Sequence, residues 1–209
     1  MTENNIIIGG VYSTSWDERP MRVLAYDNYE LFYDSWWEHK KNWGLKSHNS
    51  KVIFFRSSTS RFAKSAKLIR VDPLEPEEQE KYKLDLPFRT CRHKELKWTQ
   101  THFPSVLDFI SHCRQLNIEL SDSPAVNTNQ IILTPFGPTG GHKKSLQIVA
   151  DNGKYFRECE LLWKAQNVQA DYKSFIDFGV GLFRLGLSKR LASYYIGGYY
   201  DLAESLPRQ

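Results

Sequence analysis

The residues best suited to binding a polyanion lie in one stretch of the chain, residues 36–71. The stretch holds nine Lys or Arg and one acid, Glu38, so its net charge is 9 − 1 = +8, against +4 for the whole chain. Large aromatic residues are interleaved with these charges: Trp36, Trp37, Trp43, Phe54, Phe55 and Phe62. Cations bind phosphates and aromatic rings stack on bases, so this pattern is typical of nucleic-acid-binding surfaces. A solvated strand and loop surface with core aromatic residues gives the same pattern.

Eight residues of this stretch are predicted to contact a nucleic acid, the cations through phosphates and the tryptophans by stacking on bases. They are Trp37, Lys40, Lys41, Trp43, Lys46, Lys51, Arg56 and Arg61. The loop 37–46 contains five of them and is the most compact part of the predicted surface. The predicted protein is therefore cytoplasmic and non-catalytic, and it binds DNA or RNA or acts as an adaptor.

A second anion-binding site is predicted in the loop 137–144. Its residues are Gly140, Gly141, His142, Lys143 and Lys144. The glycines allow a close approach of the backbone, and the other three supply positive charge. The loop is not a nucleoside-triphosphate loop, because His142 stands where the second glycine belongs and a strand follows. An exposed hairpin loop is the alternative interpretation.

Two other functions are compatible with the sequence. Asp27 or Asp34, with Glu38 and Lys40, resembles the acid and Glu-x-Lys layout of metal-dependent nucleases, in which carboxylates hold Mg²⁺. Glu-x-Lys is common by chance, and an exposed loop is the alternative. The tyrosine-rich stretch 193–206 could instead bind a protein partner or form a homo-oligomer; close packing within the chain is the alternative there.

Composition narrows the class of protein. Hydrophobic residues make up 41% and charged residues 25% of 209 residues, enough for a folded core in one larger or two small domains. No stretch approaches the roughly 18 apolar residues of a membrane span, so no membrane contact is expected. The first ten residues lack the features of a signal peptide. Three widely spaced cysteines indicate reduced thiols, and no metal or cofactor motif is present.

The first half of the chain is predicted to be β-rich. Strands are expected over 4–12, 21–26, 30–37 and 51–56, which together favour an antiparallel sheet or a small, partly closed barrel. A short helix over 61–69, capped by the preceding serines, or a further strand is expected next. Residues 72–86 hold six acids and two lysines, net −4, and are predicted to be an acidic connector with a helix that begins near Pro76.

The second half is predicted to combine strands and helices, giving an α+β fold. A helix is expected after Pro104, followed by a three-stranded meander over 130–136, 145–150 and 154–157. Helices are expected over 158–168, 171–186 and 188–205. The predicted organisation is therefore a β-rich region 1–71, the connector 72–86 and an α+β region 87–209, with one continuous domain as the alternative.

Overall fold

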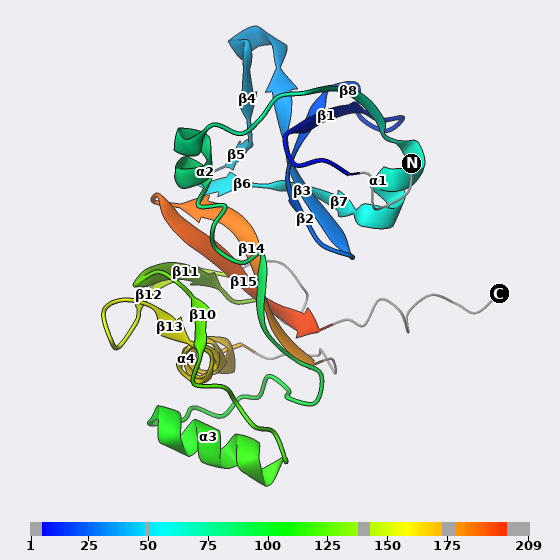
Figure 1. Cartoon of the computed structure of the whole chain (residues 1–209). Helices are drawn as coiled ribbons and strands as arrows, with labels where there is room; N and C mark the ends of the chain where they lie inside the picture. The colour runs from blue at the N-terminus through cyan, green and yellow to red at the C-terminus, as the bar shows by residue number, and fades with distance from the viewer. Residues whose placement is uncertain (1–5, 49–50, 138–142, 173–178, 200–209) are drawn as a thin grey trace, which may run out of the picture. The chain divides into compact units, whose positions relative to one another are not determined.

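The computed structural model describes residues 6–48, 51–137, 143–172 and 179–199. Strands and helices are mixed along the chain, so the predicted α+β fold class is confirmed (Figure 1). The chain divides into two compact units, Met1–Asp85 and Leu86–Gln209. Among the described residues, no helix is both long and apolar enough to cross a membrane.

The first unit is built on an open antiparallel sheet. Its elements are β1 (Gly10–Ser13), β2 (Met21–Tyr26), β3 (Glu30–Trp37), the 3-10 helix η2 (Glu38–Lys40), β4 (Asn42–Gly44), β5 (Lys46–His48), β6 (Lys51–Ile53), β7 (Phe55–Ser58), α1 (Thr59–Ser65), β8 (Lys67–Val71) and α2 (Pro76–Tyr82). The strands run in the order β4-β3-β2-β1-β8, and β7 also pairs with β3. The sheet is not closed into a barrel, so the antiparallel sheet is the alternative that is confirmed.

The two faces of this sheet differ because side chains alternate along each strand. On one face, Met21 and Val23 of β2 lie opposite Ser35 and Tyr33 of β3, and this face packs on Phe62 of α1. The other face carries the charged pair of β2 and β3, Arg22 opposite Asp34. Glu78 of α2 accepts hydrogen bonds from Arg22, so the two helices contact opposite faces of the sheet.

Both helices of the first unit begin where local sequence favours it. The hydroxyl of Ser58 accepts a bond from the backbone N–H of Arg61 and caps α1, as the serine-rich sequence before it predicts. The helix ends at Ser65, and the chain continues as β8. In α2, Pro76 stands in the first turn, and the Glu75 and Glu78 side chains form a capping box.

The second unit combines a mixed sheet with two larger helices. Its elements are β9 (Arg89–His93), α3 (Val106–Gln115), β10 (Pro124–Val126), β11 (Gln130–Thr134), β12 (Leu146–Val149), β13 (Phe156–Arg157), α4 (Glu158–Ala170), β14 (Gly179–Ser188) and β15 (Leu191–Tyr199). The strands β12, β11, β15 and β14 lie in that order, and β9 pairs with β14. The β11–β15 pair is parallel, and the others are antiparallel.

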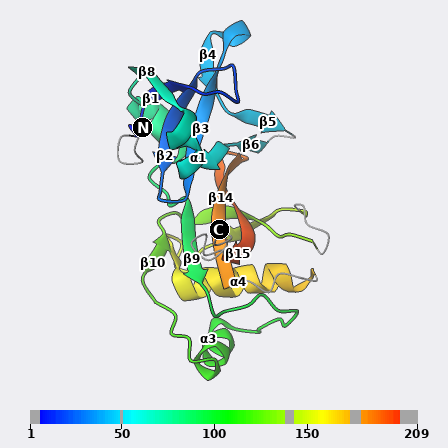
Figure 2. The ribbon, with the colours of Figure 1, turned by 90° about the vertical axis from the view of Figure 1, so that its right-hand side faces the viewer.

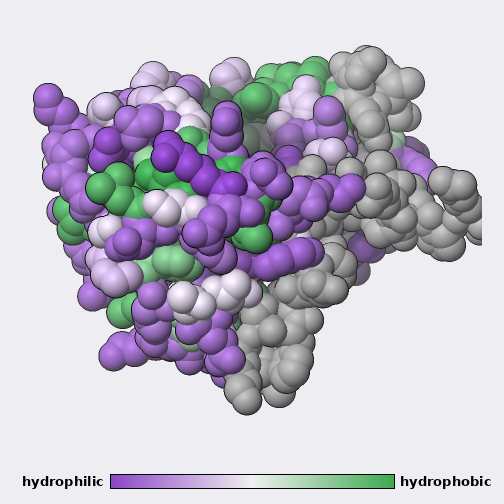
Figure 3. All heavy atoms as spheres, turned by 90° about the horizontal axis from the view of Figure 1, so that it is seen from below, coloured by the Kyte–Doolittle hydropathy of each residue, from purple (hydrophilic) through white to green (hydrophobic). Residues whose placement is uncertain are grey.

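The helix α4 lies between this sheet and α3 (Figures 1 and 2). Its apolar residues join the core of the second unit, where Leu161, Leu162 and Ala165 are fully buried. Leu107 of α3 is 70% exposed, and Leu116, which follows the helix, is 47% exposed. Seen from the side on which α3 lies, hydrophobic residues form separate areas among hydrophilic ones (Figure 3).

The helices predicted over 171–186 and 188–205 are wrong for the described residues 179–199, which form the long β14–β15 hairpin. Nine of the ten residues of β14 are buried, so both faces of the strand are covered. A strand that is buried on both faces has a continuous run of apolar residues. The periodicity of such a run does not distinguish a strand from a buried helix. Gly179, Gly181 and Gly186 disfavour the helix.

The predicted three-stranded meander is also wrong in its third member. The strands β11 and β12 pair as expected, from Gln130 opposite Val149 to Leu133 opposite Leu146. The third strand, β13, pairs instead with β10 in a separate two-stranded sheet. β13 has only two residues and α4 begins directly after it, so the chain forms no third strand long enough to run along β12.

Candidate nucleic-acid interface

The two tryptophans predicted to stack on bases lie on opposite faces of the first sheet. In the β3–β4 hairpin, Trp43 lies opposite Trp36, whereas Trp37 lies opposite Asn42. Residues directly opposite each other share a face, and neighbours along a strand do not. Trp43 therefore shares a face with Trp36, with ring centroids 5.4 Å apart, and Trp37 points to the other side. Trp37 and Trp43 do not form one stacking surface.

The six predicted phosphate-binding cations are also divided between elements. Lys40 ends η2 and Lys41 follows it with a φ of 48°, so both lie at the turn of the β3–β4 hairpin. The others lie on the elements that follow: Lys46 on β5, Lys51 on β6, Arg56 on β7 and Arg61 on α1. Arg56 lies opposite Phe32, on the face that carries Asp34, whereas Arg61 belongs to the helix on the other face.

Trp37 belongs to a surface that the sequence did not predict as a unit. We call it the aromatic–arginine face, and it consists of Trp16, Arg19, Tyr33, Trp37, Phe55 and Arg61. The guanidinium carbon of Arg19 lies 5.0 Å from the ring centroid of Trp37 and 5.5 Å from that of Phe55. Phe55 in turn stacks on Tyr33, with centroids 5.5 Å apart and an angle of 18° between the rings.

Trp16 and Arg61 extend this surface at the α1 side. The guanidinium carbon of Arg61 lies 4.7 Å from the centroid of Trp16, and Trp16 packs against the buried cluster that contains Tyr33. Burial is the main cause of the raised pKa of Tyr33, and the negative charge of Asp17 contributes to it. Tyr33 is therefore a neutral phenol at the base of the aromatic–arginine face.

Asp17 partly neutralises this face. It accepts two bonds from Arg19, Nε to Oδ1 at 3.0 Å and Nη2 to Oδ2 at 2.9 Å. These bonds are the main cause of the lowered pKa of Asp17. The Nη1 group of Arg19 makes no hydrogen bond to any residue in the described ranges, so it remains available to an anion.

The ring of Trp37 is held in place by the hairpin. Its Nε1 donates a bond of 3.1 Å to the carbonyl oxygen of Gly44. A Cβ added at Gly44 would lie 2.9 Å from the Trp37 ring, so the close approach requires glycine here. The Lys40 Nζ lies 5.5 Å from the centroid of the same ring. A ring already fixed loses little conformational entropy when a ligand stacks on it.

The opposite face of the sheet is occupied by a buried ion cluster. Arg22 donates to Asp34 at 2.8 Å and to Glu78 at 2.7 Å, and its guanidinium carbon lies 4.9 Å from the Trp43 centroid. Burial raises the pKa of Asp34 to about 6, against the lowering effect of Arg22. Burial opposes the charge of Arg22, but its bonds to Asp34 and Glu78 raise its pKa. Trp43 thus covers an internal charge cluster.

The residues of the nuclease alternative make structural contacts. Asp34 is fully buried in the ion cluster, and Asp27 accepts bonds from the backbone N–H groups of Tyr29 and Glu30. Glu38 accepts a bond from the Trp36 indole. Within the ranges that the structure describes, no three His, Cys, Asp or Glu residues are grouped so that they could hold a metal ion.

The predicted anion-binding loop lies mostly outside the described residues, since these do not include Gly140, Gly141 and His142. Lys143 is half-buried and its backbone N–H donates to Pro135, while Lys144 is exposed. In the tyrosine-rich stretch, Tyr194 is fully buried and donates its hydroxyl to the carbonyl of Pro87.

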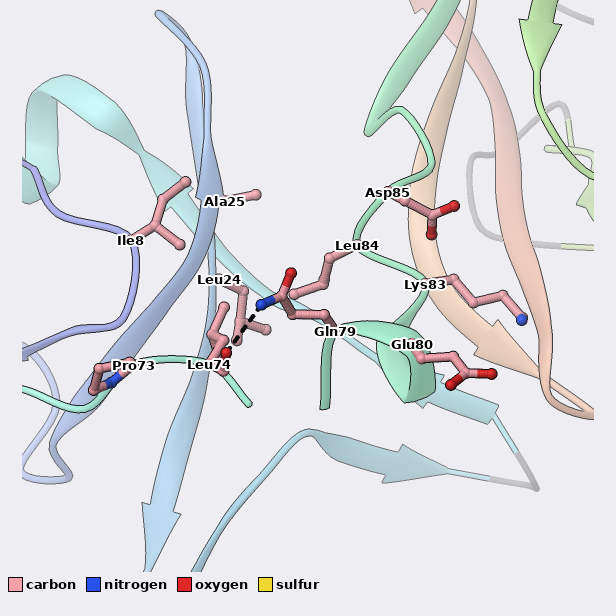
Figure 4. A pocket seen from close by; sticks show the side chains of 10 residues that line it. All are labelled: Ile8, Leu24, Ala25, Pro73, Leu74, Gln79, Glu80, Lys83, Leu84 and Asp85. Carbon is pink, nitrogen blue, oxygen red and sulfur yellow. Dashed lines mark hydrogen bonds between the residues drawn. The ribbon is translucent and has the colours of Figure 1, made fainter. Parts of the chain in front are cut away.

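The first unit also contains a pocket of about 730 Å³ beside α2 (Figure 4). Its floor is largely apolar, with Leu24 from β2 and Leu74 and Leu84 from the segments around the helix. The amide of Gln79 crosses it and donates to the carbonyl of Leu74 at 2.9 Å. The Gln79 amide is therefore engaged with the chain itself, and the charged residues Glu80, Lys83 and Asp85 also line the pocket.

This chain matches no family model, no curated protein and no solved structure. Of the predicted residues, Trp37, Lys40 and Arg61 lie at or beside the aromatic–arginine face. Trp16 and Arg19 also belong to this face, and no sequence pattern predicted them.

Proposed function

We propose that this is a cytoplasmic, non-catalytic protein that binds single-stranded nucleic acid through the aromatic–arginine face. The observation that carries the proposal is the position of Arg19 between Trp37 and Phe55. Planar guanidinium and aromatic groups placed side by side offer stacking positions for successive bases, whatever their sequence.

Phosphate contacts in this proposal come from cations at the edge of the same face. Arg19 has its Nη1 group available, and Arg61, Lys40 and Lys41 are exposed. A single strand suits this arrangement better than a duplex, because the bases of a duplex are already stacked and cannot reach the rings. Lys46, Lys51 and Arg56 have no part in the revised interface.

The first test is a titration with labelled single-stranded and duplex oligonucleotides at two salt concentrations. Four phosphate contacts at about −0.7 each give a slope of about −2.8 for log affinity against log salt, so a fourfold rise in salt should weaken binding roughly 50-fold. Binding that is absent at low salt, or that does not change with salt, would refute the proposal.

The second test compares two tryptophans of the same hairpin. Trp37→Ala should cost about 1–3 kcal/mol of binding free energy, roughly a 5- to 150-fold loss of affinity, if a base stacks there. Trp43→Phe is the matched control, because Trp43 lies on the opposite face, and it should leave affinity unchanged. Equal losses in the two variants, with both still folded by circular dichroism, would place the ligand elsewhere.

A further inference from the structure

The strand β12 is an unprotected edge of the second sheet. Among the described residues of its unit it pairs with β11 alone, without a register shift, and it contains neither proline nor charge. Leu146 and Val149 are 41% and 48% exposed. Edge strands are normally protected by charges, proline or bulges, and β8 in the first unit has both a bulge and two cations. β12 has none of these protections.

The backbone of β12 offers hydrogen bonds outward at two residues. The Ala150 N–H donates to the Asn129 carbonyl at 2.9 Å, and inward and outward positions alternate along an antiparallel pair. Ile148 therefore bonds to β11, whereas the N–H and C=O groups of Gln147 and Val149 point away from it. No residue in the described part of the chain bonds to these outward groups.

A groove of about 460 Å³ runs beside this edge, between β12 and α4. Its lining residues are Ile148, Val149, Ala150, Asp151, Trp163, Lys164, Asn167 and Val168. The polar members are already paired within the unit: Lys164 with Asp151 at 2.6 Å, and Asn167 with the backbone of Phe103. The surface left to a ligand is apolar and lies next to unused backbone groups, which suits an added strand.

We propose that β12 pairs antiparallel with β12 of a second copy of this chain, forming a two-fold dimer through a continuous sheet. Residues whose backbone groups point away from β11 must pair with such residues of the second copy. The register that pairs both of them places Gln147 opposite Val149 of the second copy and Ile148 opposite Ile148. The side chains of the second copy's β12 that point to the same face as α4 then lie along the groove.

Charge favours the same partner. Lys144 precedes β12 and Asp151 follows it, and both are exposed; among the described residues, Lys164 bonds only Oδ1 of Asp151, so Oδ2 can face a cation of the second copy. Antiparallel pairing brings the cationic end of one strand to the anionic end of the other, at both ends of the interface. No like charges are placed directly opposite each other.

Sedimentation equilibrium from micromolar to sub-millimolar protein tests the association. The mass should rise from one chain toward two. Leu146→Glu should weaken the dimer at least about tenfold, because it places an uncompensated charge in the apolar contact. Val149→Pro should do the same by removing an outward N–H that β11 does not use. Leu107→Glu, an exposed apolar residue of α3, is the control and should leave the mass unchanged.

Cysteine cross-linking tests the register. Ile148→Cys places two thiols opposite each other on the two-fold axis, within the Cα separation that a disulfide requires, whereas Gln147→Cys does not. The natural cysteines are all buried, so they should not react. A monomer at all concentrations, a dimer insensitive to Leu146→Glu and Val149→Pro, or cross-linking of Gln147→Cys alone would each overturn the proposal.

Discussion

The buried carboxyl group of Asp34 predicts an unusual pH dependence of stability. Its side chain has no exposed surface, and burial raises its pKa to about 6 from the usual 3.8. The unfolded chain therefore loses this proton at a lower pH than the folded chain does. Between these two values the folded state binds more protons, so the free energy of unfolding falls as the pH rises.

The size of the effect follows from the shift. The difference of 6 − 3.8 is about 2 pKa units, worth about 3 kcal/mol in full at 1.36 kcal/mol per unit. The part that falls between pH 4.5 and pH 7 is about 2 kcal/mol. Glu78 and Asp17 have lowered pKa values, so their effects have the opposite sign and lie mainly below this window.

Urea unfolding, followed by tryptophan fluorescence at several pH values, measures this dependence. Asp34→Asn should abolish the loss of stability between pH 4.5 and 7, leaving a flat or rising curve. Asp85→Asn, which removes an exposed carboxylate of the same unit, is the control and should keep the wild-type curve. Stability that rises with pH in the wild type, or an equal fall in Asp34→Asn, would refute the reasoning.

Three further predictions concern local features. Lys189 and Arg190 form the two-residue turn of the β14–β15 hairpin, with φ values of 51° and 65°. Positive φ values favour Asn and Gly, so Lys189→Asn with Arg190→Gly should stabilise the protein by about 1–2 kcal/mol. Thermal unfolding measures this, and an unchanged Tm would contradict it. Ser58→Ala removes the cap of α1 and should cost about 1 kcal/mol in the same assay, whereas no loss would show that the cap is dispensable. Asp17→Asn removes the negative charge that partly neutralises Arg19, so oligonucleotide binding should become tighter; weaker binding would count against the proposed face.

The sequence predicted the centre of the first sheet well. Strands β2 and β3 have the predicted bounds, because their alternating side chains and the Asp27 turn between them are local signals. The hairpin β14–β15 was not predicted. Its strands are covered on both faces, and they pair with β11 and β9, which lie far away in the chain, so local periodicity does not separate strand from helix.

The candidate site was predicted only in part, for a related reason. The sequence predicts a polar loop or a broken helical turn over residues 38–50. The structure has a helical turn, η2, and then returns the chain through β4, which places Trp43 on the opposite face of the sheet from Trp37. Trp16 and Arg19 lie in an irregular loop, where no periodicity predicts the direction of a side chain. They reach the site only because β2 and β3 bring that loop beside Phe55.

Strand β3 contributes to two unrelated surfaces, since Tyr33 and Trp37 belong to the aromatic–arginine face and Asp34 to the ion cluster behind it. We therefore expect substitutions and length changes in this strand to have different consequences during evolution. Point substitutions on one surface leave the other intact, so the two surfaces can diverge separately among descendants of the gene. Insertion or deletion of one residue within β3 would shift the alternation of its side chains. Asp34 would then point to the aromatic–arginine face, and the aromatic rings would point to the face that carries Arg22. Lineages that retain the fold should vary in sequence along β3 but keep its length.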